Sequence, residues 1–426
     1  MILSVSLVLQ IAAASDSFPR ITLAEALRRA PRLDPVYVAA QGAVDNAEWY
    51  RRAARSAIVL PSVRLTSDVA RYSAPTFVLG ADQPQDRSVS ARIEGSYEVF
   101  TGGRKFADLS RAKADLEASH AQEIRERFES ERRAESDYYQ VLADEELTRL
   151  ARERVRRARE QLLVARARVA SGSAVSTDSL QVLLELNQAR LGELTQTARL
   201  RVSRLQLGRR VGMDGPVGAI PLADVPPQLP ITLEAAVAEA NRTGPAIAEA
   251  RAREESADAL VRAERGSYLP TITLGAASSA YDTKLFPDET YRSALVVSAS
   301  LPIWDGAQRE IAMSRARVDR EIARVTRLDA ERAVARDVTS AYTVYETAIA
   351  ATQLAQEAIV VARENYRVQE TRYRAGANTI LDFLEAQIAL TEAEAELVQA
   401  RHANRLALAG VETLLGRRLF NDGARQ

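Results

Sequence analysis

Two hydrophobic periodicities run along this chain and predict two kinds of element. Over most of its length, apolar residues recur every three or four positions, as on one face of a helix. In segment 334–366 the spacing alternates between four and three, which is the heptad pattern of a helix that packs against another helix. This row consists of Val334, Val338, Ala341, Tyr345, Ala348, Thr352, Ala355, Ile359, Ala362 and Tyr366.

Shorter segments place apolar residues at every second position, as in a β-strand. The first row contains Val89, Ala91, Ile93, Tyr97 and Val99, and a second contains Tyr291, Leu295, Val297, Ala299, Leu301 and Ile303. Alternation over about ten residues is typical of a transmembrane β-strand with one face toward lipid and one toward a lumen. A strand of a soluble sandwich alternates as well, so the pattern alone leaves both interpretations open.

The chain contains the same landmarks twice, about 205–210 residues apart. ITLAEALRRAPRLDP (21–35) returns as ITLEAAVAEANRTGP (231–245), VLPSVRL (59–65) as YLPTITL (268–274), and VFTGGRK (99–105) as IWDGAQR (303–309). Glycine-containing breaks follow at 168–183 (RVASGSAVSTDSLQVL) and 372–387 (RYRAGANTILDFLEAQ), and then QLGRR (206–210) and LLGRR (414–418). The ordered matches indicate an internal duplication.

Each copy is predicted to have the same order of elements. A helix begins near Pro35 or Pro245 and ends at a Leu-Pro pair, because the residue before a proline disfavours the helical conformation. Two strands follow, then a very long helix over 105–170 or 307–374, then the glycine break and a shorter helix. About 66 helical residues at a rise of 1.5 Å give a rod of about 100 Å.

The N-terminal segment and the linker set the predicted boundaries. MILSVSLVLQIAAAS is apolar, ends on small residues and is shorter than the about 20 residues that span a bilayer, which predicts a cleaved signal peptide. We therefore expect a signal peptide over 1–14, the first repeat over 15–212, a linker rich in proline and glycine over 213–230, the second repeat over 231–418, and a C-terminal tail over 419–426.

Composition removes several classes of function. The formal net charge is zero, which gives no basic field for nucleic acid. Cysteine is absent, and the two histidines, His120 and His402, lie far apart in helical text, where we expect them on helix surfaces. We therefore expect no disulfide and no metal site. No phosphate-binding loop and no nucleophile motif is present, so we expect no cofactor and no enzymatic activity.

The number of predicted strands requires several chains. One chain supplies four strands, and a sheet in a membrane must close because unpaired backbone groups cost several kcal/mol each in lipid. About eight strands are the practical minimum for a barrel. The sequence therefore predicts a mixed fold of long coiled-coil helices and membrane β-strands, assembled from several copies.

The duplicated plan, the motifs FTGGRK and WDGAQR, and the turn YRAGANTILDFLEAQ resemble the TolC family of outer-membrane efflux channels. The resemblance covers essentially the whole chain after the signal peptide. It implies a homotrimer with a twelve-stranded β-barrel in the outer membrane and an α-helical barrel crossing the periplasm. It further implies a passive exit duct that contacts outer-membrane lipid, docks on a periplasmic adaptor and is fed by an inner-membrane transporter.

In that resemblance the two glycine breaks are periplasmic hairpin tips. Gly172 and Gly376 are expected to end their helices with positive φ, a role that needs no further function. Adaptor docking is implied for the surrounding tip residues, which are Gly172, Ser173, Gly376, Ala377 and Thr379.

Two carboxylates match the acidic aperture positions of the family. Asp382 and Glu385 are three residues apart and therefore share a helix face. The resemblance implies that they line the constriction at the periplasmic end of the channel. The alternative is that acids and hydroxyls at the start of the returning helices, such as Asp178, Thr177 and Thr379, only cap those helices.

The resemblance also implies closed-state links between the tips. Tyr373 and Asp178 match one linked pair, and Thr177 matches a member of another. The partner of Thr177 in the family is an arginine, whereas this chain has Asn378. An asparagine forms hydrogen bonds without charge assistance, so the second link differs in kind.

Three other functions fit parts of the pattern. The same fold serves as an exit duct for secreted polypeptides, as in type I secretion. A coiled-coil periplasmic adaptor would need further β-domains, and no run of short strands supplies them. A structural coiled-coil surface protein would leave the duplicated hairpins and alternating strands without a purpose.

Overall fold

The computed structural model describes residues 18–77, 84–221, 228–282 and 290–420. The chain forms two compact units, which we call the helical unit and the sheet unit. The helical unit comprises Met1–Val38, Arg125–Ala240 and Arg336–Gln426, and the sheet unit comprises Ala39–Ile124 and Asn241–Ala335. The two longest helices, α3 (Arg104–Ala170) and α7 (Gln308–Arg374), contribute residues to both units.

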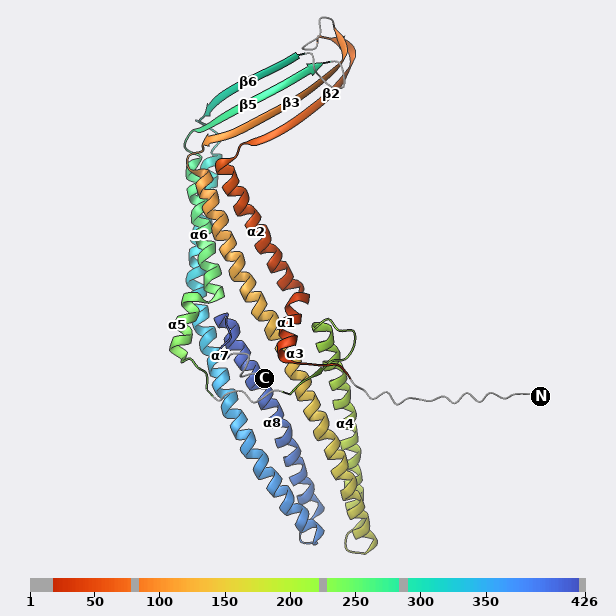
Figure 1. Cartoon of the computed structure of the whole chain (residues 1–426). Helices are drawn as coiled ribbons and strands as arrows, with labels where there is room; N and C mark the ends of the chain where they lie inside the picture. Colours follow the sequence, from red (N-terminus) through yellow and green to blue (C-terminus); the bar gives the residue numbers. More distant parts are fainter. Residues whose placement is uncertain (1–17, 78–83, 222–227, 283–289, 421–426) are drawn as a thin grey trace, which may run out of the picture. The chain divides into compact units, whose positions relative to one another are not determined.

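The sheet unit contains one four-stranded antiparallel sheet in the order β2-β3-β5-β6 (Figure 1). Its strands are β2 (Ser62–Thr76), β3 (Gln85–Phe100), β5 (Thr271–Asp282) and β6 (Thr290–Ser300). Helix α2 (Pro35–Val59) precedes β2 and α6 (Pro245–Gly266) precedes β5. Both helices begin at the predicted prolines and end before the Leu-Pro pairs, as the sequence indicated.

The register of this sheet brings the predicted apolar rows onto one face. Leu65 pairs with Ile93, and Ala276 pairs with Leu295. Since β-strand side chains alternate between faces, the neighbours two positions away follow them. The apolar face carries Val63, Leu65, Val69, Val89, Ala91, Ile93, Tyr97, Ile272, Leu274, Ala276, Tyr291, Leu295, Val297 and Ala299. The predicted row was too long at its end, because Leu301 and Ile303 follow β6.

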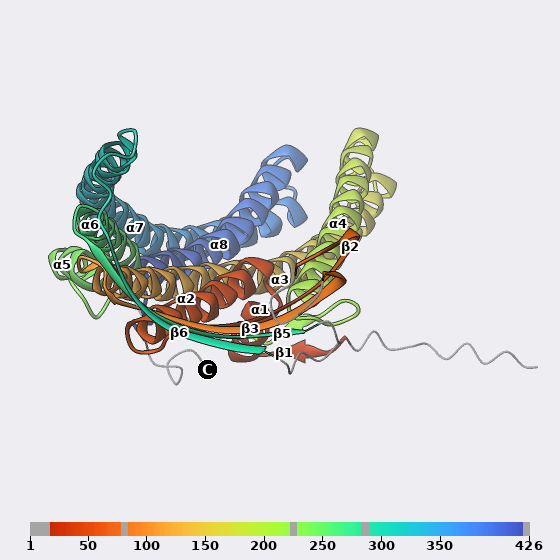
Figure 2. The same cartoon turned by 90° about the horizontal axis from the view of Figure 1, so that it is seen from above.

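The helical unit contains α3 from Arg125 onward and α7 from Arg336 onward. It also contains the two helices that follow them, α4 (Ser176–Arg210) and α8 (Ile380–Leu415). Within this unit the four helices lie side by side in the order α7, α8, α3, α4 (Figures 1 and 2). The predicted heptad row on α7 is buried at Val338, Tyr345 and Ala355, which confirms the packing interpretation of that pattern.

A small layer that the sequence analysis did not predict lies across these helices. It contains α1 (Leu23–Leu33), α5 (Leu233–Thr243) and a parallel pair of two-residue strands, β1 (Arg20–Ile21) and β4 (Gly218–Ala219). Tyr138 of α3 holds the strand pair in place, since its hydroxyl donates to the carbonyl of Ile220 at 2.7 Å. The two strands carry too few residues for a periodicity to show, whereas α1 and α5 bury residues at helical spacing, such as Leu23, Ala26 and Ala30.

The last arginine of the GRR motif in each repeat contacts the same helix, α3. Arg210 forms an ion pair with the buried Asp137 of α3. Arg418 contacts Glu135 of α3 at 2.6 Å and Glu412 of α8 at 2.8 Å. Each motif therefore anchors the end of its repeat to α3 through a charge-assisted hydrogen bond.

Some predicted segments fall outside the described residues. These are the signal peptide over 1–14, residues 222–227 of the linker and residues 421–426 of the tail. Among the described residues, no helix has the length and apolar character needed to cross a membrane.

Candidate functional site

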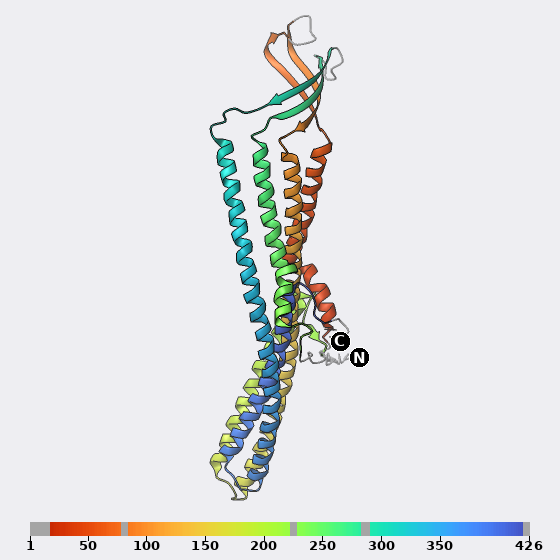
Figure 3. The same ribbon diagram turned by 90° about the vertical axis from the view of Figure 1, so that its left-hand side faces the viewer.

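The two glycine breaks form turns of the same backbone geometry at one end of the helical unit (Figures 1 and 3). We call the turn over 171–175 the first tip and the turn over 375–379 the second tip. Gly172 has φ of 73° and Gly376 has φ of 75°, the left-handed conformation that glycine adopts without strain. This confirms the predicted role of both glycines as helix-terminating residues.

Matching hydrogen bonds close the two helices. In the first tip, the amide of Ser173 donates to the carbonyl of Arg168 at 2.8 Å, and in the second, the amide of Ala377 donates to the carbonyl of Arg372 at 2.8 Å. Each glycine amide also donates to the carbonyl three residues before it, and the two bonds together form the Schellman motif. The five residues for which docking was predicted, Gly172, Ser173, Gly376, Ala377 and Thr379, are all exposed.

Behind the tips, all four helices contribute to one apolar cluster. Phe383 of α8 is fully buried, and its ring stacks on that of Tyr373 with centroids 5.4 Å apart. Tyr366 adds a third ring, 5.6 Å from Phe383. The remaining buried members are Val155, Ala158, Leu162, Ala165, Val182, Leu186, Ala189 and Ile380. This packing fixes the positions from which both tips project.

Arg168 joins the two tips within one chain. Its guanidinium donates to the backbone carbonyl of Tyr373 in the second hairpin and to that of Ser173 in the first at 3.4 Å. The same group lies over the Tyr373 ring, 4.5 Å from the centroid, in a cation–π contact. A single side chain of α3 therefore holds the end of α7.

The Tyr373 hydroxyl lies inside this arrangement without a hydrogen-bond partner among the described residues. Burial raises the pKa of Tyr373, the negative charge of Asp178 acts in the same direction, and Arg168 opposes both. Tyr373 and Asp178, predicted as a linked pair, thus lie close enough to interact electrostatically, but no hydrogen bond joins them in the described residues.

Asp382 caps its own helix. Thr379 is the N-cap of α8, and its hydroxyl accepts from the amide of Asp382 at 3.2 Å, while the Asp382 carboxylate accepts from the amide of Thr379 at 3.0 Å. This is a capping box, so the capping role considered for these residues is confirmed. Hydrogen bonds from the Thr379 hydroxyl and amide hold the pKa of Asp382 below its usual range.

Neither Thr177 nor Asp178 is the N-cap of α4, but Asp178 lies in the first turn, where its negative charge suits the helix dipole. The N-cap of α4 is Val175, which offers no side-chain hydrogen bond. Thr177 is exposed and Asp178 is half-buried. Valine has no polar atom on its side chain, so the first turn of α4 keeps its amides without this partner.

The predicted aperture carboxylates share an exposed face. Asp382 and Glu385 lie in the first turns of α8 and are both exposed, next to the exposed Leu381. The capping box occupies the Asp382 carboxylate without covering it. Capping and a position at an aperture are therefore compatible.

Asn378 is engaged inside its own hairpin. Its side-chain amide donates to the Gln369 side chain at 2.8 Å and to the Gln369 carbonyl at 3.2 Å. Within the described chain no hydrogen bond joins Asn378 to Thr177, and a link between these residues stays a prediction.

Sequence reasoning missed Arg168, Gln369 and Phe383. A signal for Arg168 was present, since it stands four residues before Gly172 as Arg372 stands four residues before Gly376. Arg372 is exposed, however, so the sequence position alone does not identify which arginine turns inward.

The histidines lie apart from the tips. His120 is exposed on α3, as expected. His402 of α8 is half-buried rather than on the surface, and burial lowers its pKa. In the described ranges, no group of three histidine, aspartate or glutamate side chains is arranged to hold a metal ion.

Two curated relatives match much of this chain. It is 28% identical over 393 residues to the pyoverdine export outer membrane protein OpmQ of Pseudomonas aeruginosa, which covers 86% of this chain and 80% of OpmQ. It is 25% identical over 200 residues to the outer membrane protein TolC of Escherichia coli, covering 44% of this chain and 41% of TolC.

Solved structures share the fold. A membrane protein from Pseudomonas aeruginosa superposes with a TM-score of 0.80 at 18% identity, covering 94% of this chain and 92% of that protein. The family model for outer membrane efflux proteins matches residues 13–212 and 236–417. Because these residues make up most of its length, the chain belongs to the outer membrane efflux protein family.

Proposed function

We propose that three copies of this chain close into one channel, a passive exit duct of the outer membrane whose helical end faces the periplasm. In this assembly the sheets form a β-barrel and the helices form an α-helical barrel. The observation that carries the proposal is the sheet, which has an apolar face and two outer strands that are each paired along one edge only.

The opposite face of the sheet supports a water-filled interior. It carries Arg64, Asp68, Arg92, Glu94 and Arg292 on three of the four strands. A wall with apolar residues on one side and charged residues on the other suits a barrel with lipid outside and water inside. The outer edges belong to β2 and β6, and their unpaired backbone groups need partner strands in lipid.

The helical unit supports the same edge-to-edge assembly. Helices α4 and α7 lie at the two outer positions of its four-helix row (Figures 1 and 2). Each exposes a row of large apolar residues separated by seven or fourteen positions, Leu184, Leu191 and Leu205 on α4 and Leu354, Val361 and Val368 on α7. Such rows are heptad seams without a partner in one chain. Packing α4 of one copy on α7 of the next is a head-to-tail contact, which closes into a ring.

Three copies is the number that the family resemblance gives. Four strands per chain then make a barrel of twelve, which exceeds the minimum of about eight. The cargo class that we propose is small molecules, supported by the match to OpmQ, which is an export protein for pyoverdine.

The tips are the proposed periplasmic end. We place Asp382 and Glu385 at the constriction, where copies of the exposed acidic face would meet around one axis. Gly172, Ser173, Gly376, Ala377 and Thr379 form the proposed docking surface for a periplasmic adaptor, which an inner-membrane transporter feeds.

We propose that links between the tips hold the channel in its closed state. Among the described residues the Tyr373 hydroxyl accepts and donates no hydrogen bond, and the Asp178 charge acts on it, which supports a link between these two. Thr177 and Asn378 would form the second link across neighbouring copies.

Light scattering of the detergent-extracted protein tests the assembly. The expected mass of the protein component is that of three chains. Leu191→Glu with Val361→Glu places like charges on both seams and should give smaller species, whereas Leu33→Glu, at an exposed apolar residue of α1, should not. A monodisperse monomer of the unmodified protein would exclude the barrel.

A further inference from the structure

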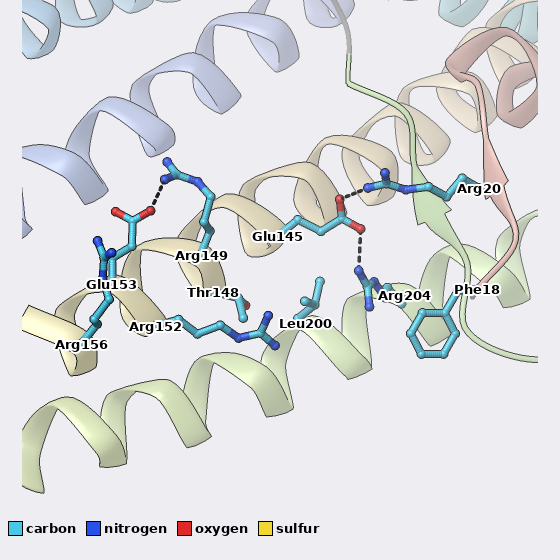
Figure 4. Close-up of a pocket in the computed structure, with 10 residues that line it drawn as sticks. All are labelled: Phe18, Arg20, Glu145, Thr148, Arg149, Arg152, Glu153, Arg156, Leu200 and Arg204. Carbon is cyan, nitrogen blue, oxygen red and sulfur yellow. Dashed lines mark hydrogen bonds and ion pairs between the residues drawn. The ribbon is translucent and has the colours of Figure 1, made fainter. Parts of the chain in front are cut away.

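An arginine-rich groove in the helical unit lies away from the tips, between α3, α4 and the start of β1 (Figure 4). Its volume is about 530 Å³, within the range of ligand-binding pockets. The groove is lined by Phe18, Arg20, Glu145, Thr148, Arg149, Arg152, Glu153, Arg156, Leu200 and Arg204. Five arginines and two glutamates give it an excess of positive charge.

One part of the groove already binds a carboxylate from within the chain. Glu145 accepts from Arg20 at 2.7 Å on one oxygen and from Arg204 at 2.7 Å on the other. Arg204 also lies over the Phe18 ring, 4.9 Å from its centroid. These contacts hold the three elements together and fix the wall of the groove.

Arg149 is occupied as well. Its guanidinium contacts Glu153 at 2.6 Å and Glu146 at 3.1 Å. Because two neighbouring carboxylates already accept hydrogen bonds from Arg149 and offset its positive charge, this arginine is less available to a ligand.

The next two arginines of α3 differ from these three. The closest carboxylate to Arg152 is that of Glu193 at 3.8 Å, too long for a hydrogen bond. Arg156 makes no ion pair or hydrogen bond in the part of the chain that the structure describes. In Figure 4 neither arginine has an interaction with the other residues of the groove. Arg152 therefore has only a long ion pair, and Arg156 has no acidic partner among the described residues.

We propose that this groove binds an acidic peptide segment of a partner protein, with successive carboxylates on Arg152 and Arg156. The two arginines are four residues apart on a helix, which corresponds to about 6 Å along its axis. Alternate side chains of an extended peptide project on one side about 6.6 Å apart. An extended segment with acidic residues at every second position therefore matches the spacing.

The residues that line the groove favour spaced carboxylates over a polyphosphate. A guanidinium binds a carboxylate through two parallel hydrogen bonds, as its planar fork allows. Glu145 and Glu153 lie in the same groove and would repel a densely charged polyphosphate more than single carboxylates spaced along a chain. Phe18 and Leu200 offer apolar contact to residues between the acids.

Fluorescence anisotropy with a labelled peptide of repeating Asp-Ser sequence tests the proposal on the detergent-purified full-length protein. We expect saturable binding at low salt that weakens as salt rises, because the contacts are ionic. The matching Asn-Ser peptide should not bind. Arg152→Gln with Arg156→Gln should weaken binding about tenfold or more.

The control variant is Arg166→Gln with Arg372→Gln, which removes the same charge from exposed positions near the tips and outside the groove. Arg166 is ten residues from Arg156, about 15 Å along the helix axis. At about 0.1 M salt this variant should leave peptide affinity within about twofold of the unmodified protein, since exposed charges beyond a Debye length of about 10 Å are screened. Equal loss in the two double variants would overturn the site, because the peptide would then respond to net charge alone. Tighter binding of inorganic polyphosphate than of the peptide would overturn the assignment to carboxylates.

Discussion

The two tips of this chain share a backbone and differ in what their side chains do. Each ends its long helix with a glycine at a φ near 75° and with the same pair of hydrogen bonds. The second tip starts its returning helix with the Thr379–Asp382 capping box, whereas the first starts at Val175 without a side-chain cap. Glycine fixes the turn, so the side chains around it were able to diverge.

The arginine before each glycine shows the same divergence. Arg168 reaches from the first hairpin to the carbonyl and ring of Tyr373, while Arg372, at the matching position, is exposed. The acids differ too, because Gln181 occupies the place that corresponds to Glu385. One chain thus contributes two distinct tips to the end of the duct that we propose faces the periplasm.

Substitution of the tip glycines is expected to have the largest effect on export. Gly376→Val and Gly172→Val both place a β-branched residue at positive φ, which costs about 1–3 kcal/mol. Only at Gly376 would the new Cβ meet Arg168, 3.5 Å away, while the space around Gly172 is open. We expect Gly376→Val to reduce export more, with normal outer-membrane insertion of both variants, measured by substrate accumulation and membrane fractionation.

Equal loss of export in the two glycine variants would show that the Arg168 contact does not matter. Failure of insertion with retained crosslinking to an adaptor would show that the tips are wrongly placed at the docking end.

Removal of the contacts that Arg168 makes between the two tips should have the next largest effect, on channel conductance. Arg168→Met retains a long unbranched side chain but removes the hydrogen bond to the Tyr373 carbonyl and the positive charge over the Tyr373 ring. These interactions together contribute about 1–3 kcal/mol. The freed tips should open more readily, which raises single-channel conductance in planar bilayers. Arg372→Met is the matched control and should leave conductance unchanged, because that side chain is exposed. If both variants behaved alike, the Arg168 contacts would have no part in closure.

The acidic face of the second tip should have a smaller effect, on selectivity. Asp382→Asn with Glu385→Gln should reduce cation preference and block by multivalent cations, because a ring of carboxylates attracts cations. Asp178→Asn at the half-buried position of the first tip should leave both unchanged. Since the pKa of Asp382 is lowered, its charge and its contribution to the cap persist above the ordinary aspartate pKa of about 3.9 and are lost only as the pH falls through the lower folded value.

Unchanged reversal potentials in the doubly substituted channel would remove these carboxylates from the aperture. Asp382 would then be a helix-capping residue alone. Glu160→Gln, at an exposed acid of α3, controls for the general loss of negative charge.

The smallest expected effect makes the first tip resemble the second. Val175→Thr supplies the missing N-cap hydroxyl, and Asp178 stands at the third position of the helix, where it would complete a capping box. The cap should stabilise the first turn of α4 by about 0.5–2 kcal/mol. Hydrogen exchange of amides 176–179 should slow, while exchange in the first turn of α8 stays the same. Faster exchange would mean that the carboxylate of Asp178 is needed elsewhere.

Local patterns in the sequence predict the repeated architecture of this protein. The heptad and alternating rows identified the long helices and the strands, because burial of one face repeats at the period of each element. Prolines set the ends of α2 and α6, and glycines set both tips, since these residues restrict or free the backbone locally. Each of these features depends on residues close together in the chain.

Which side chains contact each other depends on how distant segments of the chain pack together. Arg168 and Tyr373 are 205 positions apart, and no local pattern distinguishes Arg168 from Arg372. The groove containing Arg152 and Arg156 likewise needs α4 and the segment before β1 to complete it. The two-residue strands β1 and β4 exist only because the fold brings Arg20 beside Gly218. Contacts between distant segments depend on how the helices pack, and a periodicity records that a face is buried but not which residues cover it.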